Sequence, residues 1–330
     1  MRARSGLTVA AGDTRWLAAA ASLAERARPL ASPNPGVGAI IVRDGVVAGR
    51  GWTQPGGRPH AEAVALAMAG EQAKGAAMYV TLEPCAHRSE RGPACADLVA
   101  EAGLARVVIG MRDPDPRTAG AGMARLREAG VQVDEAGLAA SALGLGGHEA
   151  WLTLGRQHIT LKLALSLDGC IAMASGESRW ITGEASRAHT HRERARADAI
   201  LVGGGTLRAD KPRLDVRLPG LEGRSPQRLV LTRGASPAGW RALASPEAVR
   251  ELADIRYLFI EGGAQTAAAF LAADLVDRLL IYRAPVIIGG GIAGIGDIGL
   301  AGLASAHGRW QREDARNLGA DTLEIYSRTR

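Results

Sequence analysis

The sequence PHAEAVAL at residues 59–66 and the sequence TLEPCAHRSERGPACADLV at residues 81–99 decide how the first half of this chain folds. The first stretch opens a helical pattern, and the apolar run at residues 77–82 predicts a buried strand that ends at the second stretch. A further helix is expected to begin at Cys95 and to stop at Gly103. This arrangement puts His60 and Cys95 at helix N-termini and Cys85 in a turn that enters a helix, where the helix dipole favours thiolates.

These residues have the chemistry of a catalytic metal site. One imidazole (His60) and two thiols (Cys85 and Cys95) are ligands that Zn²⁺ prefers, and three protein ligands leave a fourth position for water. Glu62 is then a spare carboxylate that can move protons to and from that water. The pattern H-x-E, then P-C and a second Cys, is typical of zinc-dependent nucleobase deaminases, although nine residues separate the two cysteines here. The alternative is a closed structural site with His87 as fourth ligand, which would not require Glu62.

Length and composition predict an enzyme with two domains, which we place at residues 1–150 and 151–330. A hydrophobic content of 47% and a charged content of 22% are ordinary for a globular protein. Three cysteines make no disulfide framework, which favours a cytoplasmic location. The first residues lack the apolar core of a signal peptide, and no run is long and apolar enough to span a membrane.

The formal net charge of +6 raises the question of nucleic acid as a partner. Lysine occurs only at positions 74, 162 and 211, so the basic residues reflect a bias toward arginine. No basic run is interleaved with aromatic residues, and aromatic residues make up only 4% of the chain. We therefore expect a phosphorylated small molecule as substrate, with no nucleic-acid and no membrane partner.

The first half alternates between helical and extended patterns, which indicates an α/β layer sandwich. An amphipathic helix is expected over 16–27, and a loop with the sequence ASPNPG follows it at residues 31–36. Asn34 in this loop is a candidate reader of a ring edge, and an ordinary turn residue is the alternative. The expected strands are 37–42, 46–51, 77–82, 106–111 and 131–133, with a hairpin turn at 44–45 and a helix at 123–129.

The second half begins after an Ala/Gly-rich junction at residues 138–155. Lys162 lies in an apolar strand, where it is either functional or reaches the sheet edge with its ammonium group. Two strands end in glycines and lead into a helix, at 203–206 and 261–263, and such turns are phosphate cradles. A G-x-G-x-x-G pattern at 294–299 has no helix after it, and we interpret it as a loop. Strands are expected at 159–165, 199–202, 228–232, 257–260, 279–282 and 322–327, and helices from 185 and at 267–271.

The stretches PNPGVGAIIVRDG, HAE, YVTLEPCAH and ARVVIGMRDPDPRTAGAG together resemble the bifunctional deaminase/reductase of riboflavin biosynthesis. The resemblance implies a cytidine-deaminase-like α/β/α sandwich that deaminates a ribosylated diaminopyrimidinone phosphate. By position it implies one Zn²⁺ per chain held by His60, Cys85 and Cys95, with Glu62 as proton shuttle. Asn34 and His87 would face the pyrimidine.

The second half resembles the reductase domain of the same family through TLKLALSLDG, ASGESRWITG, RADAILVGGGTLRADKPRLDVR, IEGG and VDRLLIYRAPVIIGG. The resemblance implies a dihydrofolate-reductase-like α/β domain that uses NADPH to reduce the ribosyl group to ribityl, with Lys162 near the reacting centre. The stretch between Thr232 and Tyr257 is short for this family. The implied NADPH contacts are Ala164, Trp180, Thr206, Asp210, Gly262 and Gly263, and the implied substrate contacts are Ser178, Arg194, Leu214, Arg217 and Glu261.

Three alternatives remain beside this interpretation. The chain could be a nucleobase or nucleoside deaminase with a non-catalytic ligand-binding C-terminal domain. It could act on the bases of nucleic acids, or its first half could be a structural zinc module. Pairing of chains into a homo-oligomer is left open by the sequence.

Overall fold

The computed structural model describes residues 11–87, 90–139 and 144–330 of the chain. The chain divides into two compact units, Met1–Gly155 and Arg156–Arg330, so the division that we place after residue 150 falls inside helix α5 (Gly146–Leu154). Residues 1–10, where we expect no signal peptide, and 140–143 of the Ala/Gly-rich junction lie outside the described residues. In the described part, every helix is too short or too polar to cross a bilayer.

The first unit is built on a five-stranded sheet with the order β2-β1-β3-β4-β5. Strand β1 pairs antiparallel with β2 and β3, whereas β3, β4 and β5 run parallel. Asp44 and Gly45 both have positive φ, 53° and 77°, which is the geometry of the expected hairpin turn. The strand bounds are β1 (Gly38–Arg43), β2 (Val46–Trp52), β3 (Ala77–Leu82), β4 (Arg106–Met111) and β5 (Gln132–Glu135).

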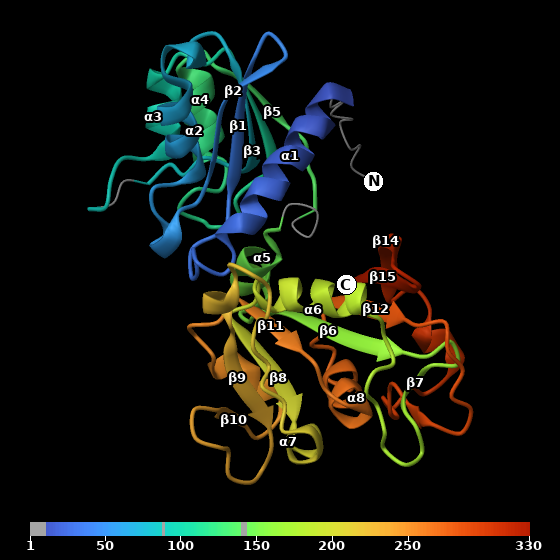
Figure 1. The fold of residues 1–330 in the computed structure, drawn as a ribbon. Coiled ribbons are helices and arrows are strands. Elements are labelled where there is room, and N and C mark those ends of the chain that lie inside the picture. The colour runs from blue at the N-terminus through green and yellow to red at the C-terminus, as the bar shows by residue number, and fades with distance from the viewer. Residues whose placement is uncertain (1–10, 88–89, 140–143) are drawn as a thin grey trace. The chain divides into compact units, whose positions relative to one another are not determined.

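Helices cover both faces of this sheet, as Figure 1 shows. Helix α1 (Ala11–Ala27) packs on one face through Leu17, Ala20 and Leu23, against Ile40, Tyr79 and Val108. The neighbouring strand residues Ile41, Val80 and Ile109 point the other way, into a core shared with α2, α3 and α4. This alternation confirms the α/β/α sandwich. The helix bounds are α2 (Ala61–Ala69), α3 (Cys95–Glu101) and α4 (Ala121–Glu128).

Helix α2 lies unusually close to strand β2. A Cβ atom at Gly51 would lie 2.3 Å from the Ala61 carbonyl oxygen, and one at Gly49 would lie 2.2 Å from that of Ala65. Both glycines are therefore needed for the helix to lie directly on the strand. This close packing fixes the start of α2, where His60 and Glu62 are found.

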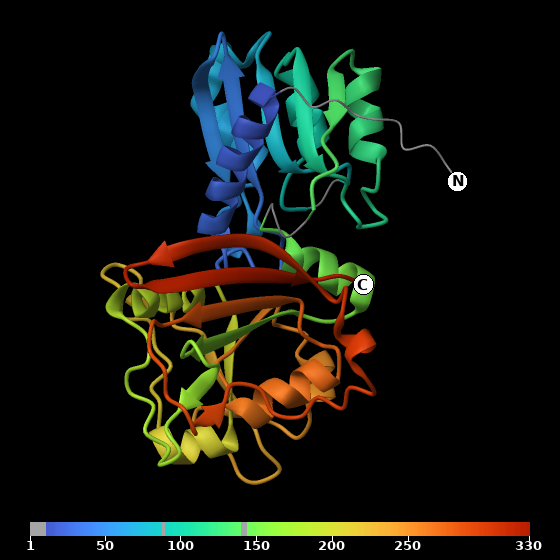
Figure 2. The same cartoon turned by 90° about the vertical axis from the view of Figure 1, so that its right-hand side faces the viewer.

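The second unit contains an eight-stranded sheet with the order β10-β9-β8-β11-β6-β12-β15-β14. The strands from β10 to β12 are parallel, and β15 and β14 add an antiparallel edge that Figure 2 shows as a long hairpin. The strand bounds are β6 (His158–Leu165), β8 (Ala199–Gly203), β9 (Gln227–Leu231), β10 (Arg241–Leu243), β11 (Tyr257–Ile260), β12 (Arg278–Arg283), β14 (Trp310–Leu318) and β15 (Asp321–Arg328).

Helices also lie on both faces of the second sheet. Helix α8 (Ala264–Ala272) packs Ala267 and Phe270 into one core, and α6 (Glu184–Arg194) lies on the other face, where His189 contacts Tyr282. The short helix α7 (Gly204–Asp210) follows β8 directly. The G-x-G-x-x-G stretch is irregular beyond β13 (Ile292–Ala293), as predicted, and β13 pairs with β7 (Cys170–Ala172). The short stretch before β11 holds only β10 and a 3₁₀ helix, Pro246–Glu251.

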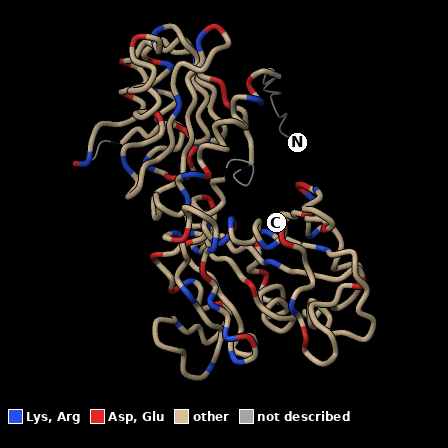
Figure 3. The backbone as a smooth tube through the Cα atoms, in the orientation of Figure 1, with Lys and Arg blue, Asp and Glu red and all other residues tan. Residues whose placement is uncertain are grey.

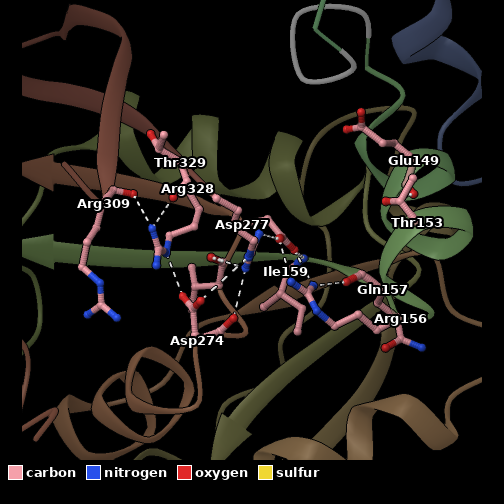
Figure 4. A network of polar contacts seen from close by, with 12 residues as sticks. Glu149, Thr153, Arg156, Gln157, Ile159, Asp274, Asp277, Arg309, Arg328 and Thr329 are labelled. Atoms are coloured by element: carbon pink, nitrogen blue, oxygen red, sulfur yellow. Dashed lines mark hydrogen bonds and ion pairs between the residues drawn. The ribbon is translucent and has the colours of Figure 1, made fainter. Parts of the chain in front are cut away.

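A buried ion pair fastens the start of the second unit to its sheet (Figure 4). Arg156 donates two hydrogen bonds to the Asp277 carboxylate, at 2.7 and 2.8 Å, and the two side chains are only 3% and 8% exposed. The same carboxylate accepts the backbone N–H of Ile159 at 2.8 Å and a hydrogen bond from Arg330 at 2.6 Å. Burial raises the pKa of Asp277, but the hydrogen bonds and charge of Arg156 lower it by more, so the net shift is downward.

We predict that Asp277→Asn destabilises the second unit by about 3–5 kcal/mol at pH 7, because Arg156 is left buried without a counter-charge. The lowered pKa means that the carboxylate contributes stability above its unfolded pKa of about 3.9, and that this contribution is lost as the pH falls through the folded pKa. The difference in the free energy of unfolding between wild type and variant, measured with denaturant, should therefore become smaller in acid. Asp254→Asn, in an exposed pair with Arg241, is the matched control. Equal effects of the two substitutions at pH 7 would contradict the prediction.

Candidate metal centre and reductase site

The first candidate site gathers three metal-binding side chains from three segments. His60 is the N-cap residue of α2, Cys95 is the first residue of α3, and Cys85 lies just beyond the end of β3. The Nδ1 atom of His60 lies 3.1 Å from the Cys95 sulfur and 3.7 Å from the Cys85 sulfur. Cys85 is ten residues ahead of α3 rather than in a tight turn, yet its sulfur accepts the Cys95 backbone N–H at 3.3 Å.

This geometry fits a tetrahedral zinc ion. The three ligand atoms all lie within 4.8 Å of one another. In a tetrahedral site with bonds of about 2.0–2.3 Å, neighbouring ligand atoms are separated by roughly 3.5–3.8 Å. The distances of 3.1 and 3.7 Å from His60 Nδ1 to the two sulfurs are within a few tenths of an ångström of this spacing.

Glu62 provides a second observation in favour of a metal site. Its side chain lies in the first turn of α2 and is only 3% exposed. The Oε2 atom is buried and has no hydrogen-bond partner among the residues that the structure describes. Burial raises the pKa of this carboxyl above its usual range. A buried carboxylate oxygen without a partner beside three metal ligands is suited to proton transfer in this site.

The pKa values of the two thiols of the site shift in opposite directions: the hydrogen bond with Cys85 and burial raise the pKa of Cys95. A hydrogen bond with the Cys95 thiol lowers the pKa of Cys85 to about 4. Burial lowers the pKa of His60, but its hydrogen bond with Cys85 and the charge of Glu62 raise it by more. The thiolate is the form of cysteine that binds metals, so this environment prepares Cys85 as a ligand.

Of the two residues expected near the pyrimidine, Asn34 precedes His60 in the chain and His87 stands between Cys85 and Cys95. The Asn34 side chain packs against Gly57, three residues before His60. His87 follows Cys85 closely, and its Nδ1 atom lies 3.5 Å from the hydroxyl of Thr118. Thr118 belongs to the DPDPRTAGAG stretch, and sequence reasoning did not single it out as a neighbour of His87.

In the second unit, Lys162, Arg194 and Glu261 converge from three elements. Glu261 follows β11, and its carboxylate accepts two hydrogen bonds from Arg194 at the end of α6, at 2.5 and 2.9 Å. The Lys162 ammonium, on β6, lies 3.8 Å from the same carboxylate. Burial lowers the pKa of Lys162, whereas the pKa of Glu261 falls because Arg194 and Lys162 outweigh the effect of its burial.

The loop after α7 completes this cluster. The Asp215 carbonyl oxygen accepts a hydrogen bond from Arg194 at 3.0 Å, and His191 Nδ1 lies 3.1 Å from the same oxygen. Arg217 is exposed, and its backbone N–H lies 3.3 Å from His191 Nδ1. Leu214 is buried with a positive φ of 54°. His191 and Asp215 were not among the predicted site residues; their roles depend on a loop path that the sequence pattern does not reveal.

The two strand–glycine–helix turns lie next to each other because β8 and β11 are parallel neighbours. A Cβ atom at Gly263 would lie 3.5 Å from the Thr206 hydroxyl, and those at Gly203 and Gly262 would meet Thr266. Gly262 and Gly263 lead directly into α8. Ala164 lies two residues beyond Lys162 on the same face of β6. The turns therefore present two helix N-termini side by side, as a phosphate cradle requires.

The polar loop before α6 carries the remaining predicted residues, Ser178 and Trp180. Trp180 is 66% exposed, with the Arg187 guanidinium 5.0 Å from its ring centroid. Arg179 donates a hydrogen bond at 3.0 Å to the carbonyl oxygen of Asp210 at the end of α7. Ser178 is half-buried beside them in the chain. This contact brings the loop to the same end of the sheet as Asp210.

A cavity of about 640 Å³ lies between α7 with the loop after it, strand β9 and the segment 232–240. Four cations line it, and Arg228 lies over the Trp240 ring, 5.4 Å from its centroid. Arg213 pairs with Asp215, but the ion pairs found among the described residues involve none of the other three. A cavity with unpaired cations and an indole is suited to a phosphorylated aromatic ligand. The four cations are Arg208, Lys211, Arg213 and Arg228.

Comparison with protein families assigns each half separately. Residues 11–111 match the cytidine and deoxycytidylate deaminase zinc-binding region, and residues 157–323 match the RibD C-terminal domain. The match confirms the deaminase-like fold of the first unit and the dihydrofolate-reductase-like fold of the second. It also indicates a zinc-binding deaminase domain and a reductase domain that takes a nicotinamide cofactor.

Curated relatives match over nearly the whole chain. The riboflavin biosynthesis protein RibD of Escherichia coli is 38% identical over 94% of this chain and 97% of its own. That of Aquifex aeolicus is 35% identical over 96% of this chain and 98% of its own. That of Mycobacterium tuberculosis is 40% identical over 88% of this chain and 90% of its own. The interpretation as a deaminase with a non-catalytic C-terminal domain is therefore not favoured.

Solved structures agree with these relatives. RibD of Acinetobacter baumannii superposes with a TM-score of 0.80 and 34% identity, covering 97% of this chain and 99% of that one. A diaminohydroxyphosphoribosylaminopyrimidine deaminase/5-amino-6-(5-phosphoribosylamino)uracil reductase of Thermotoga maritima gives a TM-score of 0.83 and 30% identity, covering 96% and 99%. This chain belongs to the RibD family of bifunctional deaminase/reductases of riboflavin biosynthesis.

Proposed function

We propose that this chain deaminates 2,5-diamino-6-(5-phosphoribosylamino)pyrimidin-4-one in its first unit and then reduces the ribosyl group to ribityl in its second. The observation that carries the proposal is the convergence of His60, Cys85 and Cys95 beside Glu62, whose buried Oε2 atom has no hydrogen-bond partner among the described residues. The buried cluster of Lys162, Arg194 and Glu261 supports the second reaction.

In the deaminase half, His60, Cys85 and Cys95 hold one zinc ion. When bound, zinc supplies the Lewis acidity that makes water a nucleophile at neutral pH. Glu62 would take up a proton from the attacking water and give it to the amino group that leaves as ammonia, and its raised pKa suits both transfers. Asn34 and His87 contact the pyrimidine edge and orient the carbon that is attacked.

In the reductase half, the substrate phosphate is held by arginine and by backbone groups near the loop after α7. Arg194 uses three of its donors on Glu261 and on the Asp215 carbonyl, so it also holds these two groups in place. The lowered pKa of Lys162 suits it to give a proton to the sugar oxygen. The proposed substrate contacts are Ser178, Arg194, Leu214, Arg217 and Glu261.

The cofactor of the second half is NADPH rather than NADH. When bound, it supplies the hydride for C1 of the ribose. Ala164, Trp180, Thr206, Asp210, Gly262 and Gly263 contact it along the strand ends. The unpaired cations Arg208, Lys211 and Arg228 around the 640 Å³ cavity support recognition of the additional phosphate on the adenosine ribose.

The partners of the chain are small phosphorylated molecules. Figure 3 shows Lys and Arg interspersed with Asp and Glu along the described part of both units, which gives little support to a nucleic-acid partner. A cytoplasmic location is supported by three cysteines, Cys85, Cys95 and Cys170, that are all free. We further propose that the chain works without a membrane partner and that it forms a homo-oligomer.

The order of the two reactions can be tested with Glu62→Ala. We expect wild type to oxidise NADPH when it is given the undeaminated substrate, and the variant to do so about 10²–10⁴-fold more slowly, because general acid–base catalysis is lost. Supplying the deaminated substrate should restore oxidation in the variant. Glu71→Ala, an exposed glutamate after the same helix, should behave as wild type. Failure of wild type to oxidise NADPH with either substrate would contradict the reductase assignment.

Cofactor choice can be tested with Arg208→Ala. We expect the Kd for NADPH to rise roughly 10-fold or more, since a hydrogen bond to a charged phosphate is lost, and the Kd for NADH to stay unchanged. Arg312→Ala is the matched control, because β14 forms one edge of the sheet and β9 lies next to the other edge. Fluorescence titration of the nicotinamide measures both constants. An equal rise of the Kd values for NADPH and NADH in the variant would contradict the role of Arg208.

A further inference from the structure

Glu83 is a buried carboxylate next to the metal-binding residues that the proposed mechanism does not use. It follows β3 directly, stands two residues before Cys85, and is only 2% exposed. The ion pairs of the described residues include none with Glu83. Because a buried carboxylate without a cation is costly, its compensation has to come from hydrogen bonds.

Three backbone N–H groups from two other segments provide this compensation. One carboxylate oxygen, Oε2, accepts from Asp113 at 3.3 Å and from Gly120 at 2.9 Å. The other, Oε1, accepts from Met123 at 3.1 Å. Gly120 is the N-cap residue of α4 and has no side chain to cap it, so Glu83 caps this helix from the end of β3.

Helix α4 lies directly against the backbone just before Cys85. A Cβ atom at Gly122 would lie 2.0 Å from the Pro84 carbonyl oxygen and 3.2 Å from Oε1 of Glu83. Any side chain at this position would push α4 away from the Pro84 peptide. The contact and the three hydrogen bonds together fix the position of the peptide that carries Cys85.

The same carboxylate also holds the turn that reaches His87. Asp113, whose N–H it accepts, in turn accepts hydrogen bonds from the Asp115 backbone and from His148, both at 2.9 Å. This turn ends at Thr118, whose hydroxyl lies 3.5 Å from His87. Glu83 therefore connects two groups of the deaminase site, the Cys85 segment and the Thr118–His87 contact.

We infer that Glu83 is a positioning residue of the deaminase. It fixes the Cys85 segment and the 113–118 turn relative to each other without touching substrate. The inference rests on the proposed zinc site. An amide at this position would present an NH₂ group to at least one of the three N–H donors, since its single oxygen cannot replace both carboxylate oxygens. Glu83→Gln should therefore displace α4 or the turn while keeping the size of the side chain.

Cobalt binding tests this inference by a readout other than activity. Co²⁺ titrated into the metal-free wild type should give thiolate-to-cobalt charge-transfer and d–d absorption bands. In Glu83→Gln we expect altered d–d bands and an affinity for Co²⁺ that is roughly 10-fold weaker, as for other residues that orient metal ligands. Ammonia release should fall in the zinc-loaded variant, whereas NADPH oxidation with deaminated substrate should equal that of wild type.

Controls separate this inference from the zinc site itself. Glu128→Gln, an exposed glutamate at the other end of α4, should keep the wild-type spectrum and affinity. If wild type binds Co²⁺ with charge-transfer bands and Glu83→Gln shows the same spectrum and affinity, the role of Glu83 is overturned and the zinc site stands. A wild type without charge-transfer bands would overturn both the zinc site and this inference.

A second variant covers the case in which Glu83→Gln does not fold. Gly122→Ala leaves the carboxylate intact but separates α4 from Pro84. It should alter the cobalt d–d bands in the same direction, with the reductase activity of the same chain as an internal measure of folding. Normal bands in a folded Gly122→Ala chain would overturn the inference.

Discussion

A carboxylate buried away from water is costly unless a cation or several hydrogen-bond donors compensate it. Three buried acids of the chain meet this constraint with different partners, and a fourth meets it only in part. Asp277 has Arg156, Glu261 has Arg194 with Lys162, and Glu83 has three backbone N–H groups. Glu62 alone among these four retains a buried oxygen without a partner. The unsatisfied acid is the one beside the metal ligands, where a proton has to be taken up and released.

The direction of the parallel strands determines where the functional groups gather. In the second unit, Glu261 and the glycines of both turns follow β11 and β8, which run parallel. Ligands of open α/β sheets bind in the crevice outside these carboxyl ends. The same rule holds in the first unit, where Glu83 and Cys85 follow β3, and Asp113 follows its parallel neighbour β4. Each unit thus has its chemistry at the end of a sheet whose core is apolar.

The sequence predicts some of these features well and others poorly, for physical reasons. Strands β3, β4 and β11 have the predicted bounds because each is a short apolar run between polar or turn residues. The ligand set and Glu62 were predicted from residue types that one chemistry requires. The contact between Thr118 and His87, the capping of α4 by Glu83, and the basic cavity depend on segments far apart in the chain. Periodicity describes one segment at a time and cannot reveal such pairings.

Strand β14 was not predicted, because most of its residues are charged or polar and exposed on both faces. Its position explains this composition, since it forms one of the two edges of the eight-stranded sheet. An open edge offers unpaired backbone groups to any extended chain, and charged side chains discourage such pairing. The register shift between Arg312 and Asp314 adds an irregularity that a second flat strand would not match. The charged and polar residues that make β14 hard to predict from sequence are thus the ones that discourage edge-to-edge aggregation.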